Sequence, residues 1–266
     1  MKIITAGGDL RQKTAIKILA EKGFTIVEYR PYSTAITHDD ILLLPTPVTR
    51  DKIHLTAQNT TEPICIEEIK KVFPKAKLVI GGNFENRYVT DILKRDDFAY
   101  FNAVPTAEGA IKIAIEKTDY TLWGANVLVC GFGRVAKILI SRLIGFCPNL
   151  YVSARNNTAF SLLDSFGIKK IHAKDLCKHI NRFDVIFNTA DATLFDNEVL
   201  KNAKKDSLFI ELATNNIGFT QDFIESKYIK FVPAPSLPGK IAPVTAGKIL
   251  AETVLNIIRE NHLYYD

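Results

Sequence analysis

Short apolar runs alternate with amphipathic stretches along nearly the whole chain. Most of these runs are apolar at almost every position, instead of at every second one, and they are rich in Val, Ile and Leu. Strands that are buried on both faces have this pattern, which is typical of parallel sheets covered by helices. The sequence therefore predicts an α/β fold whose strands lie within residues 2–8, 25–29, 41–47, 77–82, 126–133, 150–155, 184–190, 207–214 and 229–235.

The alternation restarts near Asp119, after a predicted helix over residues 106–118. A new strand, turn and helix follow, so we expect one doubly wound parallel-sheet domain over residues 1–118 and a second over residues 119–241. Residues 242–266 carry apolar side chains at helical spacing, from Ile249 to Ile258. This last helix is predicted to pack back on the first domain, so that two crossing helices join the domains.

Composition narrows the classes of function. The chain of 266 residues is 47% hydrophobic and 24% charged, which is typical of a folded globular protein. Its net charge of +5 is spread along the sequence without a basic block, so we expect anionic small molecules and not nucleic acid as ligands. The four cysteines are far apart and no His lies at metal-ligand spacing, which predicts reduced, buried thiols and no metal site. No apolar stretch approaches the roughly 18 residues of a membrane span, so we expect a cytoplasmic protein.

A glycine-rich turn follows the strand at residues 126–130 and opens a predicted helix. In this context the first glycine makes the tight turn, the second lets a pyrophosphate approach the backbone, and a small residue permits close packing of helix on strand. The phosphates are expected at the positive end of that helix. Residues 119–241 are thus predicted to form a Rossmann domain that binds NAD(P) through Gly131, Phe132, Gly133, Arg134 and Val135.

The next strand ends in Ser153, Arg155 and Asn156, without an acidic residue. NAD enzymes place a carboxylate here for the ribose 2′-hydroxyl, whereas NADP enzymes place basic or small polar residues for the 2′-phosphate. Because Arg155 offers a planar fork to a phosphate, the sequence favours NADP and leaves NAD open. Later strand ends place Thr189 and Ala213, with the two residues after it, at the nicotinamide half of the same crevice.

The first domain opens with another strand-to-helix turn, in which Asp9 and Arg11 follow two glycines. Asp9 suits a helix N-cap, and Arg11 offers a bidentate site for a carboxylate beside a helix N-terminus. A simple capped turn is the alternative interpretation. Near the other end of the chain, a proline-rich segment that contains Lys240 joins the last strand to the last helix. If this helix crosses back, Arg11 and Lys240 are placed to bind two carboxylates of one substrate.

These segments together resemble one family, the A subunits of dipicolinate synthase from spore-forming bacteria. The resemblance spans almost the whole chain in order, except that residues 29–86 match only in outline and Ala136 stands where many relatives have Gly. The matching segments are Gly7-Gly8-Asp9 with Arg11-Gln12, residues 102–111, residues 118–121, Gly131-Phe132-Gly133-Arg134, Ala154-Arg155, Leu237-Pro238-Gly239-Lys240, Ala242-Pro243 and Thr245-Ala246-Gly247.

The resemblance implies an oxidoreductase that converts dihydrodipicolinate, or its hydrated precursor, into dipicolinate on a branch of the lysine pathway. It also implies that the partner is a flavodoxin-like B subunit, and that the protein works in the mother cell of a sporulating bacterium. In this interpretation Arg11 and Lys240 hold the carboxylates of the dicarboxylate substrate, and hydride passes to a nicotinamide held near Gly131. Glu108 or Asp9 then acts as the base, although either also suits a helix cap or an ion pair.

Two other functions remain open at this point. Dehydrogenases of 2-hydroxy acids and of alanine also have two doubly wound domains, but they usually carry a catalytic His near a late strand end, and residues 229–240 contain none. A non-catalytic, cofactor-binding subunit that supports the B partner is the second alternative. The sequence leaves the oligomeric state open, including a homo-oligomer.

Overall fold

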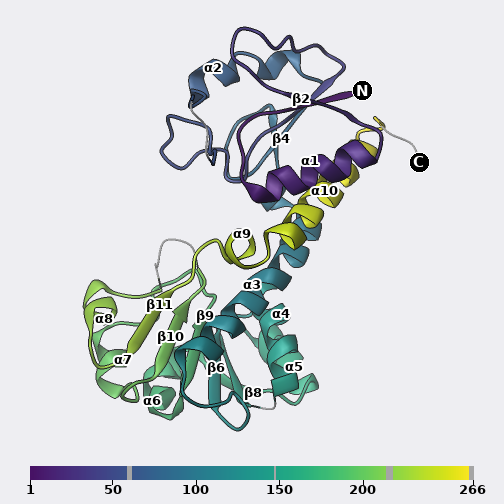
Figure 1. The fold of residues 1–266 in the computed structure, drawn as a ribbon. Helices are drawn as coiled ribbons and strands as arrows, with labels where there is room; N and C mark the ends of the chain where they lie inside the picture. Colours follow the sequence, from purple (N-terminus) through teal and green to yellow (C-terminus); the bar gives the residue numbers. More distant parts are fainter. Residues whose placement is uncertain (59–61, 147, 214–217, 264–266) are drawn as a thin grey trace. The chain divides into compact units, whose positions relative to one another are not determined.

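The computed structural model describes residues 1–58, 62–146, 148–213 and 218–263, which form two compact units (Figure 1). Unit 1 comprises Met1–Asn102 and Pro238–Asp266, and unit 2 comprises Ala103–Leu237. Each unit contains one sheet in which every strand pairing is parallel, so the predicted fold class is confirmed. The predicted domain limits at residues 118 and 241 stay a prediction.

The sheet of unit 1 has the strand order β2-β1-β3-β4-β5, a doubly wound arrangement. Its strands are β1 (Lys2–Thr5), β2 (Thr25–Glu28), β3 (Asp40–Leu43), β4 (Leu78–Gly81) and β5 (Val89–Asp91). The helices that accompany it are α1 (Leu10–Glu21), α2 (Ile66–Lys70), α9 (Leu237–Ile241), α10 (Pro243–Glu260) and the 3-10 turns η1 (Phe73–Lys75) and η2 (Ile92–Lys94).

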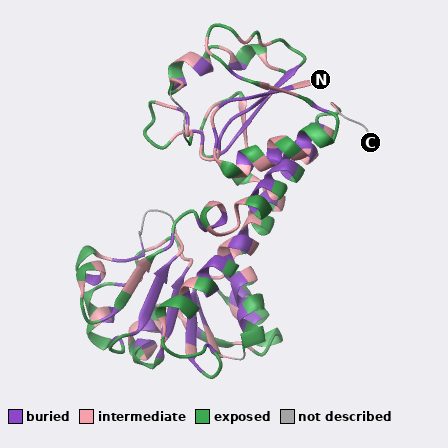
Figure 2. Ribbon diagram, in the orientation of Figure 1, coloured by how far each residue is buried: buried purple, intermediate pink, exposed green. Residues whose placement is uncertain are grey.

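Both faces of this sheet are covered. Alternate strand residues point to opposite sides, so Ile3 packs with Leu19 of α1 and Val254 of α10, while its neighbour Ile4 packs with Ile69 of α2 on the other face. Figure 2 shows the resulting burial in the strands and on the facing sides of the helices. The strands are therefore apolar at consecutive positions, as the sequence indicated.

Helices α1 and α10 lie side by side although they come from opposite ends of the chain (Figure 1). Gly247 makes their close approach possible, because a Cβ at this position would lie 2.5 Å from Cβ of Thr14 and 2.6 Å from the carbonyl oxygen of Arg11. At the far end of α10, Glu260 accepts two hydrogen bonds of 2.7 Å from Arg95. The last helix is thus an integral part of the core of unit 1.

Helix α3 (Asp96–Lys117) begins ten residues before its predicted start near residue 106. Pro105 lies inside it, where the sequence pattern indicated the start of a helix. The two acidic residues of the first turn, Asp96 and Asp97, favour the observed start because they interact with the positive end of the helix. The chain passes from unit 1 to unit 2 within this helix.

The sheet of unit 2 has the order β11-β10-β9-β6-β7-β8, which is the dinucleotide-binding arrangement. Its strands are β6 (Asn126–Cys130), β7 (Asn149–Ala154), β8 (Lys169–His172), β9 (Val185–Asn188), β10 (Leu208–Glu211) and β11 (Lys230–Pro233). The helices are α4 (Arg134–Leu143), α5 (Asn157–Ser165), α6 (Leu176–His179), α7 (Asn197–Asn202), α8 (Gln221–Glu225) and the 3-10 turns η3 (Ile144–Phe146), η4 (Ala173–Asp175) and η5 (Ile180–Arg182).

The cysteines follow the prediction only in part. Cys130 is buried at the end of β6, but Cys65 and Cys177 are partly exposed, and Cys147 lies outside the described residues. The three described cysteines are free thiols. Burial raises the pKa of the Cys130 thiol far above its ordinary value, so this side chain is a neutral part of the core.

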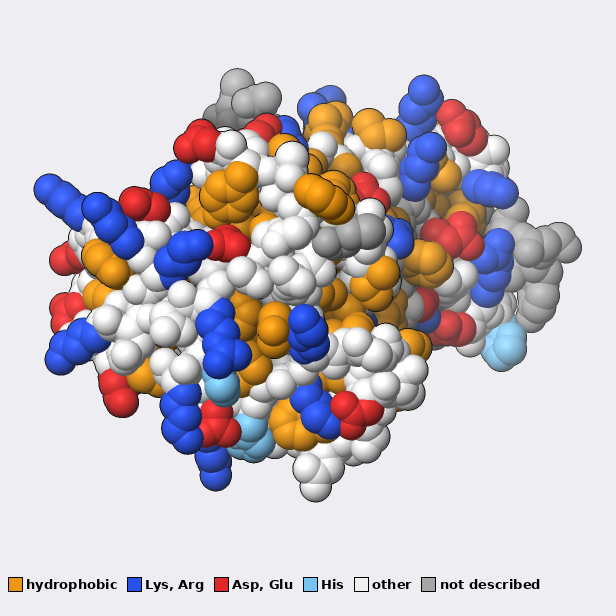
Figure 3. Space-filling view, turned by 90° about the horizontal axis from the view of Figure 1, so that it is seen from below, with side chains coloured by type: hydrophobic (Ala, Val, Ile, Leu, Met, Phe, Trp, Pro, Cys, Tyr) orange, Lys and Arg blue, Asp and Glu red, His pale blue; other side chains and the backbone are white. Residues whose placement is uncertain are grey.

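Charged side chains are mixed over the face of the molecule that Figure 3 shows, where Lys and Arg are interspersed with Asp and Glu. Oppositely charged side chains also pair along the helices, as Lys112 does with Glu116 and Lys178 with Asp175. None of the described helices has the length and hydropathy that a membrane span requires.

Candidate functional site

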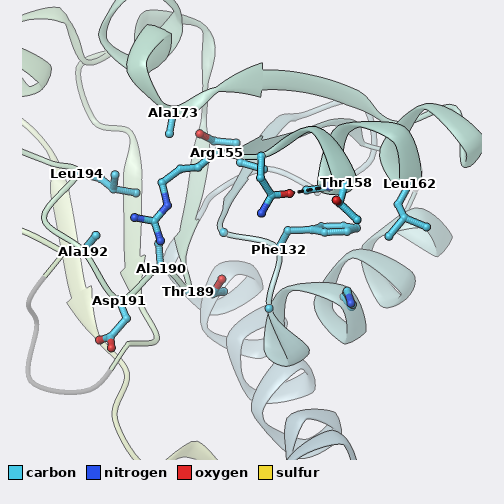
Figure 4. Close-up of a pocket in the computed structure, with 17 residues that line it drawn as sticks. Phe132, Arg155, Thr158, Leu162, Ala173, Thr189, Ala190, Asp191, Ala192 and Leu194 are labelled. Atoms are coloured by element: carbon cyan, nitrogen blue, oxygen red, sulfur yellow. Dashed lines mark hydrogen bonds between the residues drawn. The ribbon is translucent and has the colours of Figure 1, made fainter.

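A cavity of about 450 Å³ lies at the carboxyl edge of the unit 2 sheet (Figure 4). Its walls come from the segments that follow β6, β7 and β9. Strand β6 has β7 on one side and β9 on the other, so the chain winds in opposite directions from this point. Ligands of doubly wound folds bind at such a switch point, because the loops diverge there and leave a crevice.

The glycine-rich turn forms the floor of this cavity. Gly131 has a φ of 101°, and its N–H donates a 2.8 Å hydrogen bond to the carbonyl oxygen of Ser153. A Cβ on Gly131 would lie 2.5 Å from Oγ1 of Thr189, so only glycine fits. A Cβ on Gly133, the N-cap of α4, would have no atom within 4 Å. The backbone at Gly133 is therefore open to a ligand at the positive end of the helix.

The end of β7 supplies one wall. The Ser153 side chain is buried, and within the described part of the chain its hydroxyl has no hydrogen-bond partner. Arg155 is exposed and extends across the cavity toward the segment that carries Ala190 (Figure 4). The Asn156 side chain caps α5 by accepting a 2.8 Å hydrogen bond from the N–H of Ala159. The wall thus combines a cation with polar groups and contains no carboxylate that would repel a phosphate.

The segment after β9 supplies the opposite side, and the segment after β10 begins on the neighbouring strand. The hydroxyl of Thr189 donates a 2.8 Å hydrogen bond to the carbonyl oxygen of Cys130, which fixes the segment at the floor. The N–H of Ala213 donates to Oε1 of Glu211 at 2.8 Å. Glu211 is fully buried, as is its neighbour Asn188 on β9. Thr214 and Asn215, which we also expected here, lie outside the described residues.

Most of the residues predicted from the sequence to bind the cofactor line this cavity. Arg134, Val135 and Ala213 are not among its lining residues, although Arg134 and Val135 directly follow Gly133 in the chain. The cofactor contacts themselves stay a prediction for all of them. Those that line the cavity are Gly131, Phe132, Gly133, Ser153, Arg155, Asn156 and Thr189.

Some lining residues were missed. Lys137 lies on the first turn of α4 with its Nζ 5.4 Å from the ring centre of Phe132, and Thr158 lies on the first turn of α5. Asp191 lines the cavity three residues after the end of β9. Helical spacing places Lys137 one turn from Gly133, and this was the available signal.

In unit 1 the structure brings Asp9 and Arg11 into direct contact. Asp9 caps α1, and Arg11 donates side-chain hydrogen bonds to its carboxylate at 2.7 and 2.9 Å and another to the carbonyl oxygen of Thr46 at 2.5 Å. Burial acts to raise the pKa of Asp9, but the hydrogen bonds and charge of Arg11 outweigh it and lower that pKa. Part of the Arg11 guanidinium is therefore already bound to a carboxylate.

The two remaining predicted residues lie in different places. Lys240 is exposed on α9, next to Gly239, whose Cβ would lie 3.2 Å from Nε of Arg11. The segment around Lys240 is thus packed on the Arg11 side chain. Glu108 is on α3 in unit 2, where its exposed carboxylate lies 3.8 Å from Nε of Arg142. In the described part of the chain, no group of His, Cys, Asp and Glu side chains is arranged to hold a metal ion.

Known proteins share both the sequence and the fold of this chain. Residues 2–103 match the family described as the N-terminal domain of the A subunit of dipicolinate synthase. The A subunit of dipicolinate synthase of Bacillus subtilis (strain 168) is 28% identical over 98% of this chain and 96% of its own length. This chain is similar in sequence and in fold to the A subunits of dipicolinate synthase.

Solved structures extend the comparison to the fold. The crystal structure of the A subunit of dipicolinate synthase from Bacillus halodurans has a TM-score of 0.88, with 28% identity and coverage of 97% of each chain. A transhydrogenase from Sinorhizobium meliloti has a TM-score of 0.69 with 16% identity, over 98% of this chain and 95% of its own. At that identity the likeness concerns the fold alone. The family resemblance that the sequence suggested is confirmed.

Proposed function

We propose that this chain is the A subunit of a dipicolinate synthase, which uses NADP(H) to oxidise dihydrodipicolinate, or its hydrated precursor, to dipicolinate during sporulation. The observation that carries the proposal is the cavity of unit 2, where an exposed arginine stands at the end of β7 in place of an acidic residue. The name of its relatives supports the product, and their fold supports oxidoreductase chemistry.

The cavity suits a nicotinamide dinucleotide in three respects. The open backbone at Gly133 and the first turn of α4 offer N–H groups to the pyrophosphate. The buried Ser153 hydroxyl offers a partner to the ribose. Arg155 offers a fork of N–H donors to a 2′-phosphate, with Lys137 as a second cation among the lining residues. These residues support NADP(H) over NAD(H).

From dihydrodipicolinate the reaction removes one hydride and one proton of the ring, which becomes an aromatic pyridine dicarboxylate; from the hydrated precursor one water molecule is lost as well. The oxidised nicotinamide, when bound, supplies the hydride acceptor. Arg11 and Lys240 hold the two carboxylates in this proposal, and because Asp9 already engages Arg11, a substrate carboxylate shares that guanidinium or displaces Asp9. The proton acceptor is Glu108 or Asp9, and the lowered pKa of Asp9 weakens that carboxylate as a base.

The assembly and the cellular place of the protein are part of the same proposal. The designation of the relatives as A subunits supports a partner chain. We take this partner to be the flavodoxin-like B subunit of the same enzyme. We propose that the pair acts in the cytoplasm of the mother cell. A homo-oligomer of this chain remains a further arrangement to measure.

A direct assay tests the reaction. The purified chain, with and without its proposed B partner, is mixed with freshly generated dihydrodipicolinate and NADP⁺ or NAD⁺, and nicotinamide reduction is followed together with dipicolinate absorbance. We expect dipicolinate to form faster than the spontaneous background, with NADP⁺ preferred. No acceleration under any combination would overturn the assigned reaction and leave the fold unaffected.

Arg155 provides the test of cofactor choice. We expect Arg155→Ala to weaken NADP(H) binding at least about tenfold, because a charged hydrogen bond contributes about 1.5–3 kcal/mol, while NAD(H) binding changes little. Arg182→Ala is the matched control, since Arg182 is exposed in the same unit but does not line the cavity. Equal losses for both cofactors would assign Arg155 to general charge attraction.

Two alternatives predict different results. A dehydrogenase of 2-hydroxy acids or alanine would act on those substrates and needs a catalytic His, but the described residues that line the cavity include none. A non-catalytic subunit would bind the cofactor and tolerate Arg11→Ala and Lys240→Ala without loss of dipicolinate formation. The proposed catalytic subunit loses activity in both variants.

A further inference from the structure

Two fully buried polar residues end neighbouring strands beneath the cavity of unit 2. Asn188 is the last residue of β9 and Glu211 is the last residue of β10, and they are direct partners in the register of the sheet. The chain that follows Asn188 forms the cavity wall from Thr189 to Leu194. The chain that follows Glu211 includes Ala213. Both segments leave the sheet at the edge where the nicotinamide half of the site is expected.

The two side chains bind each other and the backbone of both segments. Nδ2 of Asn188 donates hydrogen bonds of 3.0 Å to each carboxylate oxygen of Glu211, and Oδ1 of Asn188 accepts one of 3.1 Å from the N–H of Ala190. The Glu211 carboxylate also accepts hydrogen bonds from the backbone N–H of Ala213 and of Gly218. One carboxylate therefore connects the segment after β9 with the segment after β10.

The chain passes so close to this pair that it leaves no room for a side chain. A Cβ at Gly218 would overlap with Nδ2 of Asn188 and lie 2.5 Å from Oε2 of Glu211. The carbonyl oxygen of Gly218 accepts hydrogen bonds from the N–H groups of Leu194 and Phe195, at 3.0 and 2.9 Å. The rings of Phe195 and Phe219 stack with centres 4.4 Å apart. The segments are thus also held to each other directly.

Packing alone does not account for a carboxylate at this position. Burial raises the pKa of Glu211, while the hydrogen bonds from Asn188, Ala213 and Gly218 act to lower it and the charge of Asp191 acts to raise it. Among the described residues, the groups in contact with the carboxylate are hydrogen-bond donors, and the neighbouring Cys130 thiol is neutral. A carboxylate with four acceptor sites satisfies such a set of donors, whereas a shorter apolar side chain would leave them unpaired.

We propose that Glu211 is a positioning residue that holds the segment after β9, from Thr189 to Leu194, in the arrangement that binds the nicotinamide. The inference rests on the proposed function, since it assigns a nicotinamide to this side of the cavity. Asn188 is its partner in this role. Ser153 and Arg155, on the adenine side, follow β7, which β6 separates from β9 in the sheet, so we expect the adenine half of the cofactor to respond less than the nicotinamide half to loss of the pair.

The experiment compares two ligands on the intact protein. Wild type, Glu211→Gln and the exposed control Glu198→Gln are titrated with NADPH and with adenosine 2′,5′-bisphosphate, which carries only the adenine half. A glutamine in place of Glu211 would turn an N–H₂ group toward the donors of Asn188 and Gly218. We expect NADPH to bind at least about fivefold more weakly to Glu211→Gln, and the fragment to bind within about twofold of wild type. The control behaves as wild type.

A second variant separates positioning from folding. Glu211→Asp keeps the charge but withdraws the carboxylate by one methylene, so we expect an intermediate loss of NADPH affinity and an unchanged affinity for the fragment. If Glu211→Gln fails to fold, the affinities of Glu211→Asp for NADPH and for the fragment are compared instead. Equal weakening of both ligands, or no weakening of either, would overturn the inference.

The outcome for wild type tests the proposed function separately. If wild type prefers NADH, then NADH and ADP replace the two ligands and the inference about Glu211 is tested unchanged. If wild type binds none of these ligands, the proposed function fails, and the inference fails with it. Binding by wild type with no selective loss in the variants overturns the role of Glu211 alone.

Discussion

A methyl group at Gly131 would lie in the space that Thr189 occupies. Gly131→Ala also forces alanine into a φ of 101°, so we expect a loss of stability of roughly 2–4 kcal/mol from backbone strain and overlap together, and a loss of NADPH binding. Thermal unfolding and NADPH titration measure these effects.

Gly124→Ala is the matched control for this substitution. Gly124 has a φ of 73°, but its Cβ would have no atom within 4 Å. Gly124→Ala therefore introduces the backbone strain of a positive φ without overlap of the new methyl group with other atoms. We expect it to lose about 1–2 kcal/mol in the free energy of unfolding and to retain its affinity for NADPH. A similar result for both variants would show that overlap with Thr189 is unimportant.

Some residues of the candidate site could be predicted from the sequence and others could not. That Gly131, Gly133 and Arg155 line one cavity could be predicted because the pattern that marks them is local, a turn between a strand and a helix. Asn188 and Glu211 could not, because their contact depends on the register between two strands separated by a helix. A polar residue at the end of an apolar strand was the only signal. Likewise, no sequence pattern indicated that the guanidinium of Arg11 already donates hydrogen bonds to the carboxylate of Asp9.

Among the elements, the pair of helices α1 and α10 offers the clearest test. Gly247→Ala places a methyl group 2.5 Å from Cβ of Thr14 and 2.6 Å from the carbonyl oxygen of Arg11, so the helices must separate. We expect a loss of about 1–3 kcal/mol in the free energy of unfolding, in spite of the higher helix propensity of alanine. Urea denaturation followed by circular dichroism measures it, with the exposed Lys248→Ala as control. A gain in stability would show that the helices adjust freely.

Apolar periodicity was sufficient for the buried strands and for two edge strands, β2 and β11, but it failed at the two other edges. All nine predicted strands are present, but β5 and β8 were missed. Strand β8 lies at the edge of its sheet and buries only Ile171, and β5 has three residues, all partly exposed. Such strands form because a neighbour offers hydrogen bonds, which is a tertiary cause that the local sequence does not encode.

At the scale of the whole molecule, acid is expected to affect unit 1 first. Five carboxyl groups among its described residues have a lowered pKa, those of Asp9, Asp40, Asp51, Asp97 and Glu260, the pKa of Asp97 falling to about 2. A carboxyl group with a lowered folded-state pKa contributes stability above its unfolded pKa and loses it as the pH falls toward the folded value. Stability therefore declines from about pH 5 to about pH 2. Among the described residues of unit 2 one carboxyl group, that of Asp175, has a lowered pKa, and the raised pKa of Glu211 acts in the opposite direction.

Digestion with pepsin at pH 3 and pH 5, with the fragments identified by mass spectrometry, measures this order of unfolding. We expect the first cuts at pH 3 within residues 1–102 and 238–266, and slower cleavage at pH 5. First cuts within residues 103–237 would show that the carboxyl groups of unit 1 do not determine its acid stability.

Unit 1 is built from both ends of the chain, and this sets an order of events on the ribosome. Synthesis proceeds at about 5–20 residues per second, so α10 emerges roughly ten to thirty seconds after the first hundred residues. During that interval Ile3, Leu19 and their neighbours lack the helix that completes their core. Unit 2, which is continuous in sequence, can fold meanwhile. The part of the protein made first is therefore the part finished last, and the newborn chain exposes an apolar surface to chaperones until its final helix arrives.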